Sequence, residues 1–320
     1  MLLEVVAVSN TTDTIYGKMQ LSSCDADLIS RILRSHGEWG YIETELLSKV
    51  ISTDTVVYDV GAYIGTFSLG ISKYWPSRVV SVEANPASYE LLTINVLNNC
   101  QIPCELVNAA VGLNAGKAVA IGGDADNLGS ISFRELDAAH DDGSVVVELL
   151  ALRQLRRTYG DYGLLKLDLE GGEYDALRGD AVWIKENKPI VWAECNEAPS
   201  VRQLLQFYLW AELNPYYVAF PAIRLDNFKQ CLENPYPLAY EAALIGGKKE
   251  VVEQFVEVVG QNEVICKKVS TFNELKQVMW LTPRWGRKEW TELSRIELLG
   301  LLGHEVLSLD YNHFLQPDGD

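Results

Sequence analysis

The sequence has no C-x-x-C pair, no apolar run of membrane-spanning length and no excess of basic residues. Its six scattered cysteines share no spacing of a zinc ribbon or a redox motif, and they read as reduced thiols. No window holds 18 or more uninterrupted apolar residues, so we expect no membrane-spanning helix. The 27 Lys and Arg against 44 Asp and Glu give a net charge of −17, which disfavours nonspecific nucleic-acid binding.

A basic region before the first short apolar run is also missing. Met1–Glu4 therefore argues against a secretory signal, and we expect a cytoplasmic protein without membrane contact. Neither an internal repeat nor a low-complexity tract is present. With 48% apolar residues over 320 positions, the chain can bury a sizeable core, in two domains or in one large domain with appendages.

After residue 50, short β-branched runs alternate with helical segments, which predicts an α/β domain with a parallel sheet. Asn85 and Pro86 predict a helix start, and the helix extends to about Asn98. Residues 216–220 and 240–245 predict a hairpin-like pair. The other strands are expected at 55–60, 79–83, 105–111, 164–169 and 190–194.

Three parts are expected along the chain. Residues 1–50 form a lead-in, with a strand-like stretch at Leu2–Val8 and helical spacing from 25 to 50. Residues 51–246 form the main domain, in which 112–162 is irregular at first and helical later. Residues 247–320 form a mostly helical appendage after Gly246-Gly247, and its tryptophans suggest a contact between copies of the chain.

A glycine-containing turn follows the first strong strand. Asp59 to Gly65 has the spacing G-x-x-x-G, which is neither the fingerprint of dinucleotide dehydrogenases nor a phosphate-cradling loop. Glu83 ends the next strand, 18 residues after Gly65, where a carboxylate can accept hydrogen bonds from both hydroxyls of a ribose. The pair predicts a nucleoside site without a pyrophosphate.

Four blocks carry a family resemblance: VVYDVGAYIGTFSL, VVSVEANPASYELLTINVLN, NAAVG and LLKLDLEGGEYDALRG. Over roughly residues 38 to 245 the chain resembles the FkbM family of S-adenosylmethionine-dependent methyltransferases. The resemblance implies a class I methyltransferase fold, which is Rossmann-like and doubly wound, with a mostly parallel seven-stranded sheet and an antiparallel last strand. It also implies O-methylation of a hydroxyl on a sugar or secondary metabolite.

The resemblance further implies which residues hold the cofactor. The family commonly has Asn where Tyr63 stands, Pro at Ala84 or Asn85, and Asp where this chain has Arg153. The implied contacts come from Asp59, Gly61, Ala62, Tyr63 and Gly65 in the loop, from Glu83 and Ala84 beside the ribose, and from Asn108 and Ala109 beside the adenine.

Oxygen-bearing side chains gather at the ends of two further strands. A hydroxyl acceptor must lose its proton during methyl transfer, to a base or through metal polarisation. Strand alternation places Lys166, Asp168 and Glu170 on one parity, and Glu194 and Asn196 end the neighbouring strand. These side chains are expected beside the transferred methyl group, where open α/β sheets bind ligands.

Three interpretations of this cluster stay open. Asp168, Glu194 and Asn196 can bind Mg²⁺ through oxygen ligands. Alternatively, Glu170 or Glu194 acts as a metal-free general base. In the third interpretation the residues are structural: Asp168 touches the cofactor, Lys166 forms a buried pair with a carboxylate, and Glu170 and Glu173 cap the following helix through Gly171-Gly172.

His140, in an acidic segment, is a further candidate base if its loop closes over the site. The same acidic segment, from 124 to 142, would disfavour a strongly anionic acceptor. Two alternatives to O-methylation remain: N-methylation of a small-molecule amine, which needs no strong base, and a non-catalytic protein that retains the cofactor pocket.

Overall fold

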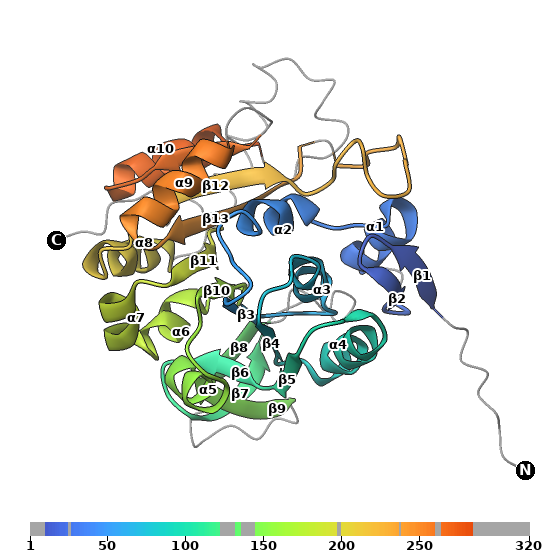
Figure 1. Cartoon of the computed structure of the whole chain (residues 1–320), viewed down its shortest axis with the longest axis horizontal. Coiled ribbons are helices and arrows are strands. Elements are labelled where there is room, and N and C mark those ends of the chain that lie inside the picture. The colour runs from blue at the N-terminus through green and yellow to red at the C-terminus, as the bar shows by residue number, and fades with distance from the viewer. Residues whose placement is uncertain are drawn as a thin grey trace, which may run out of the picture.

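A central sheet of eight strands has helices on both of its faces (Figure 1). The computed structural model describes residues 10–24, 27–121, 132–135, 145–196, 200–236, 238–259 and 264–283. The strands of this sheet are β3 (Val56–Val60), β4 (Arg78–Glu83), β5 (Cys104–Asn108), β10 (Leu164–Leu167), β11 (Ile190–Glu194), β12 (Tyr216–Pro221), β13 (Tyr240–Gly246) and β14 (Ile265–Lys268).

The strand order is β14-β12-β13-β11-β10-β3-β4-β5. Strands β5, β4, β3, β10 and β11 pair in parallel, and β13 runs antiparallel to both of its neighbours. The seven strands from β5 to β12 confirm the expected sheet and its antiparallel last strand. The count of seven was incomplete, because β14 adds an eighth strand antiparallel to β12.

Two layers of helices bury the sheet. Leu47, Phe67 and Phe255 bring α2, α3 and α9 onto one face, and α5, α6, α7, α8 and α10 pack on the other. This doubly wound arrangement leaves the strand ends as the accessible part of the sheet. The helices are α1 (Leu28–His36), α2 (Tyr41–Leu47), α3 (Thr66–Ser72), α4 (Pro86–Asn99), α5 (Leu152–Tyr159), α6 (Glu173–Arg178), α7 (Ala181–Asn187), α8 (Val201–Trp210), α9 (Lys249–Val259) and α10 (Phe272–Leu281).

The predicted helix start at Asn85 is confirmed, because its side chain accepts a hydrogen bond from the Ala87 amide at 3.0 Å. Helical spacing between residues 25 and 50 is confirmed by α1 and α2, which are separated at Gly37 and Gly40. An unpredicted hairpin, β1 (Thr11–Thr14) and β2 (Gly17–Gln20), packs near α1 and α4. This hairpin was not predicted because most of its residues are polar. The strand-like stretch expected at residues 2–8 lies outside the described part of the chain.

The stretch between β5 and α5 differs from the expectation. Instead of an irregular segment it forms a second sheet of order β6-β9-β7-β8. The strand expected at 105–111 divides at Ala109, whose amide donates to the Glu83 carbonyl at 3.2 Å. The expected strand at 164–169 ends at Leu167. The strands of the second sheet are β6 (Ala110–Gly112), β7 (Gly116–Ile121), β8 (Ser132–Glu135) and β9 (Val146–Ala151).

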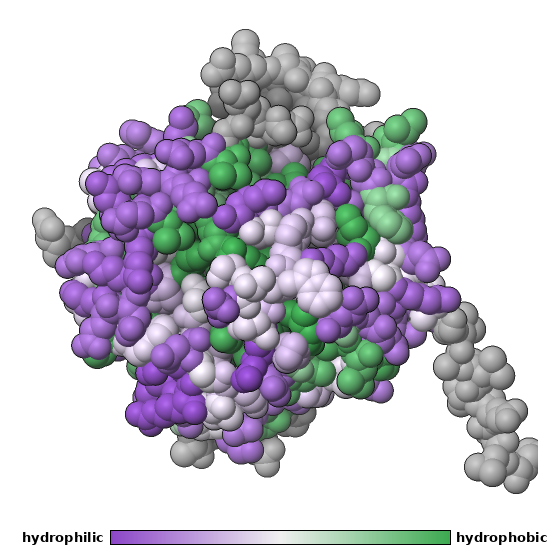
Figure 2. Space-filling model, viewed as in Figure 1, coloured by the Kyte–Doolittle hydropathy of each residue, from purple (hydrophilic) through white to green (hydrophobic). Residues whose placement is uncertain are grey.

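The described part of the tail packs on the central sheet. Phe255 of α9 contacts Trp192 with ring centroids 6.2 Å apart, and β14 extends the sheet. The division of the chain at residue 246, like the contact between copies, stays a prediction. In the residues that the structure describes, none of the helices has the length and apolar character needed to cross a membrane. Figure 2 shows hydrophilic residues over most of the rim of one face of the molecule.

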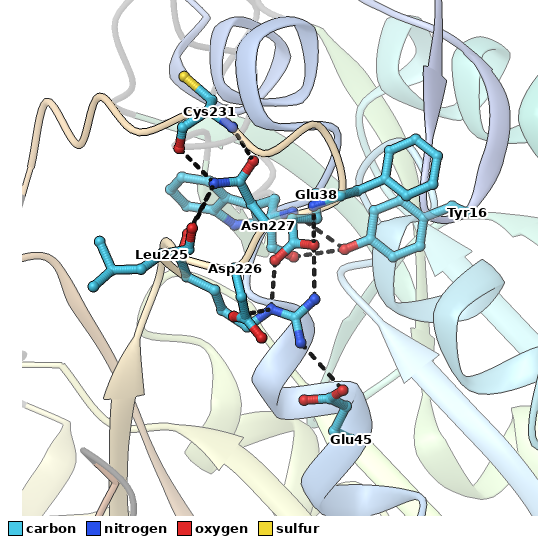
Figure 3. A network of polar contacts seen from close by, with 10 residues as sticks. Tyr16, Glu38, Glu45, Leu225, Asp226, Asn227 and Cys231 are labelled. Carbon is cyan, nitrogen blue, oxygen red and sulfur yellow. Dashed lines mark hydrogen bonds and ion pairs between the residues drawn. The ribbon is translucent and has the colours of Figure 1, made fainter.

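A buried ion pair ties the β12–β13 connection to α2. The Arg224 guanidinium donates to both Glu38 oxygens, at 2.6 and 2.7 Å, and to Glu45 at 3.2 Å. Glu38 and Glu45 converge on this group in Figure 3. The Gly40 amide, just before α2, also donates to the Ala222 carbonyl at 3.0 Å. The position of α2 therefore depends on a segment nearly 200 residues further along the chain.

Arg224→Gln should lower the free energy of unfolding by about 3 kcal/mol or more, because it leaves the Glu38 carboxylate buried without its cation. Urea denaturation measures the change. The matched control is Lys188→Gln, whose ion pair with Glu212 is much more exposed and should contribute at most about 1 kcal/mol. Equal effects of the two substitutions would contradict the assigned role of Arg224.

Candidate active site

A cavity of about 390 Å³ lies at the carboxyl edge of the central sheet. The parallel strands β3, β4, β10 and β11 end there, and β13 begins there because it runs in the opposite direction. Open α/β sheets bind ligands at this edge. Of the predicted site residues, the cavity is lined by Asp59, Gly61, Ala62, Tyr63, Glu83, Ala84, Ala109, Asp168, Glu170, Glu194 and Asn196.

Gly61 lets the chain turn where β3 meets β10. It has a φ of +87°, and a Cβ added there would lie 1.8 Å from the Asp168 carbonyl oxygen. The amides of Gly61 and Ala62 both donate to the Val82 carbonyl, at 2.9 and 3.0 Å. Only glycine fits this position, and the turn it makes brings the loop against the end of β4.

Tyr63 adopts a left-handed conformation with a φ of +49°. Asn tolerates this conformation better than Tyr does, which gives a physical reason for the Asn that the related sequences commonly have here. Gly65 stands outside the cavity lining. It has a φ of +97° and precedes α3, and a Cβ there would lie 2.9 Å from Leu92, so its role is to pack the loop.

The Glu83 carboxylate is held by the backbone of two loops. It accepts hydrogen bonds from the Tyr63 amide at 2.8 Å and from the Asn85 amide at 2.7 Å. A carboxylate has about four lone-pair sites, so two remain for a ligand. Burial raises the pKa of Glu83 to about 7, against the lowering effect of these two amides.

Asn108 supports the site from outside the cavity. Its amide nitrogen donates to the carbonyls of Glu83, at 2.8 Å, and Ala84, at 3.2 Å. The next residue, Ala109, lines the cavity itself. The expected position of both residues beside the adenine stays a prediction, and the Asn108 side chain holds the loop after β4 instead of lining the cavity.

A buried lysine sits between two carboxylates on the floor of the cavity. The Lys166 ammonium lies 3.1 Å from Asp168 and 3.8 Å from Asp59, which confirms the predicted buried pair. Burial alone would lower the pKa of Lys166, but Asp168, Glu43 and Asp59 raise it above its ordinary value. The lysine therefore stays charged and is shared by its neighbours.

Asp59 is completely buried, and its two oxygens differ in their contacts. Oδ2 accepts a hydrogen bond from Ser68 at 2.6 Å. Within the described residues, Oδ1 has no hydrogen-bond partner, and it lies 3.8 Å from the Lys166 ammonium. Burial raises the pKa of Asp59 against the opposing effect of Lys166. This oxygen therefore keeps the capacity to accept a hydrogen bond from a ligand.

Glu194 and Asn196 lie together, as predicted. The Asn196 side-chain nitrogen donates to Glu194 Oε1 at 2.5 Å. Burial, followed by the negative charge of Asp168, raises the pKa of Glu194 well above 4.5. Glu170 stands exposed with a φ of +51°. Of the two glutamates predicted to cap the following helix, Glu173 holds the turn before α6 by accepting hydrogen bonds from the Leu169 and Gly171 amides.

Two acidic residues at the cavity were missed from the sequence. Glu43 comes from α2 and accepts a hydrogen bond from the Trp192 indole nitrogen at 2.6 Å. Glu241 comes from the start of β13 and also lines the cavity. Neither residue follows a parallel strand. A search for polar residues at the carboxyl ends of parallel strands, where open α/β sheets bind ligands, therefore does not find them. The alternation of β13 was the one signal that could have placed Glu241 on the same face as Glu194.

The magnesium prediction finds no support. In the part of the chain that the structure describes, no group of three or more His, Cys, Asp or Glu side chains has a metal-binding arrangement. The Asn196 amide is committed to Glu194 through its nitrogen. His140 lies outside the described residues.

The cavity residues fit an adenosyl compound that carries a cationic amino group. Gly61 leaves room for close approach to the backbone, and Glu83 has free lone pairs beside it. Asp59 Oδ1 is a buried anionic acceptor without a donor among the described residues. This combination agrees with the S-adenosylmethionine contacts that the sequence implied.

The unfolding free energy should fall as the pH rises from about 5 to about 8. Burial raises the pKa of Glu43, Glu83 and Glu173 to about 7 and that of Glu241 to about 8, from 4.5. Over this range the folded state binds more protons than the unfolded state. The stability that these protons contribute at low pH is therefore lost as the pH rises through the pKa values of the folded state. Urea denaturation at both pH values tests this, and Glu241→Gln should flatten the profile. Rising stability would contradict it.

Comparisons with known proteins identify a family for this chain. The profile of the "Methyltransferase FkbM domain" matches residues 59–223. No curated protein matches the chain. Among solved structures, methyltransferase FkbM from Methylobacillus flagellatus KT has 16% identity and a TM-score of 0.39, over 61% of this chain and 44% of that chain. This chain therefore spans less than half of the Methylobacillus protein.

Other solved structures show similar values. An O-methyltransferase from Bacillus cereus in complex with SAH has 13% identity and a TM-score of 0.37, over 65% of this chain and 79% of that chain. Precorrin-6y C5,15-methyltransferase from Geobacter metallireducens GS-15 has 14% identity and a TM-score of 0.39, over 65% and 87%. The domain match covers just over half of the 320 residues, including the Gly61 turn and Glu83, and the chain therefore belongs to the FkbM methyltransferase family.

Proposed function

We propose that this methyltransferase uses S-adenosylmethionine to methylate a hydroxyl of a sugar or secondary metabolite. The observation that carries the proposal is that one cavity is lined by Gly61, Glu83 and Asp59, whose Oδ1 has no hydrogen-bond partner among the described residues. A second group of carboxylates at the other side of Lys166 supplies bases. The cavity thus has a cofactor part and an acceptor part.

The cofactor part would be formed by the loop after β3 and the end of β4. Asp59 Oδ1 would accept a hydrogen bond from the amino group of the methionine portion. The free lone pairs of Glu83 would accept the ribose hydroxyls, and Ala109 would lie beside the adenine. Asn108 keeps this wall in place through the Glu83 and Ala84 carbonyls.

When bound, the cofactor supplies an electrophilic methyl group on a sulfonium. With the cofactor bound, the acceptor oxygen would form the new C–O bond as the C–S bond breaks, and the sulfur would keep the electron pair of the broken C–S bond. The hydroxyl proton must leave in the same process, since a free aliphatic hydroxyl is scarcely ionised near neutral pH. The protein has to provide the acceptor for that proton.

We assign proton acceptance to Glu194. Its carboxylate is buried at the cavity, and its pKa is raised above the ordinary value, so it is a stronger base than a solvated carboxylate. Asn196 fixes one of its oxygens, which leaves the other for the acceptor. Asp168 is paired with Lys166 and is the weaker candidate for this role.

Glu83→Gln should weaken S-adenosylhomocysteine binding by about 10- to 100-fold, because a hydrogen bond to a charged group contributes about 1.5–3 kcal/mol. Calorimetry measures the affinity. Glu257→Gln, on the exposed surface of α9, is the matched control and should bind normally. Equal affinity of the Glu83 variant would remove this residue from the cofactor site.

Glu194→Gln should lower kcat by about 100-fold or more, because general-base catalysis contributes at least this much, and leave S-adenosylhomocysteine affinity unchanged. Release of S-adenosylhomocysteine with hydroxyl-only sugars and with their amino analogues measures turnover. In the wild type, kcat should rise as the pH passes the raised pKa of Glu194, because the base acts in its deprotonated form. The variant should not show this rise of kcat with pH. Retained turnover would exclude Glu194 as the base.

A further inference from the structure

The acceptor part of the cavity lies on one face of the sheet. In the strand register Asp59 pairs with Lys166 and Lys166 with Trp192. Residues that pair directly share a face of the sheet. On this face Glu194 pairs with Ala243, and Glu241, two residues before Ala243, pairs with Phe220. Glu194 and Glu241 therefore stand on the same side as the buried lysine.

Helix α2 covers this face and adds another carboxylate. The Trp192 indole nitrogen donates to Glu43 Oε1 at 2.6 Å, which fixes the glutamate over this face of the sheet. The Arg224–Glu38 ion pair and the Gly40–Ala222 hydrogen bond hold the start of α2 in place. Glu45, labelled in Figure 3, lies on the side of α2 that faces this ion pair. Glu43 is therefore a fixed part of the cavity wall.

The charges around the cavity are strongly unbalanced. Among the described residues that line it, Lys166 is the one cation, and it already contacts Asp168 and Asp59. A sulfonium cofactor brings one net positive charge to the other end. The carboxylates are Glu43, Asp59, Glu83, Asp168, Glu170, Glu194 and Glu241.

Glu241 is the clearest unpaired member of this set. Its carboxylate makes no hydrogen bond or ion pair with the described residues, and it feels the negative charges of Asp168 and Glu43. Burial raises the pKa of Glu241 to about 8 and that of Glu43 to about 7. Carboxylates withdrawn from water are normally paired with a cation, but Lys166, the cation that acts on these two, forms its ion pairs with Asp168 and Asp59.

We propose that Glu43 and Glu241 bind an ammonium group of the acceptor, so that the substrate is an amino alcohol or amino sugar. This inference rests on the proposed function, and it adds the chemical class of the substrate. An ammonium fits the pair better than a metal ion, because the described residues contain no three-ligand arrangement. Asp59 Oδ1, which has no hydrogen-bond partner among the described residues, is reserved for the cofactor, and Glu194 is left to accept the proton.

The test compares two probes of equal size, cyclohexylamine and cyclohexanol, on the full-length protein saturated with S-adenosylhomocysteine. Calorimetry should show that the amine binds at least about tenfold more tightly, as expected for a charge-assisted contact. Glu241→Gln should reduce this preference to about threefold or less, and Glu43→Gln should act in the same direction. Glu253→Gln, on the exposed surface of α9, should keep the full preference.

Thermal unfolding of each variant checks that it is folded, and two distinct failures can then be separated. Saturable binding of S-adenosylhomocysteine without a preference for the amine overturns the ammonium site and leaves the proposed function intact. An amine preference that survives both glutamate substitutions also overturns it. Absence of S-adenosylhomocysteine binding overturns the proposed function itself.

Discussion

The close approach of Gly61 to the Asp168 carbonyl is the constraint on which the site depends. It allows the chain leaving β3 to turn across the end of β10, with the Asp168 amide still bonded to the Val60 carbonyl at 2.9 Å. The turn brings the Tyr63 amide to Glu83 and leaves Asp59 beneath it. A side chain at Gly61 would separate the two strand ends, and the cofactor and acceptor parts of the cavity would no longer share one floor.

That floor is a polar row built into an otherwise apolar sheet. Ser81, Asp59 and Lys166 occupy consecutive paired positions, and Ser68 bridges Ser81 and Asp59 at 2.6 Å from each. Asp59 Oδ1 has no hydrogen-bond partner among the described residues, and its contact within the row is the ion pair with Lys166 at 3.8 Å. A buried polar network is costly when it is incomplete. The remaining hydrogen-bonding capacity of Asp59 Oδ1 is therefore available to a ligand.

The sequence predicted the parts of the molecule that are encoded locally. The Gly61 turn, Glu83 and the Asn85 cap follow short strands, and their residue types report their backbone positions. Glu43 and Glu241 could not be found in this way, because they reach the cavity through helix packing and an antiparallel strand. Strand β14 and the second sheet were missed for a related reason: their few residues become strands only when partners distant in sequence are present.

The outer edge of the central sheet, within the described residues, is β14. Its last two residues, Lys267 and Lys268, are exposed. Lysines on an edge strand discourage another strand from adding to it, because a second copy aligned antiparallel would bring like charges face to face. The short strand thus protects this edge of the sheet against strand addition by a second molecule, while β5 forms the opposite edge.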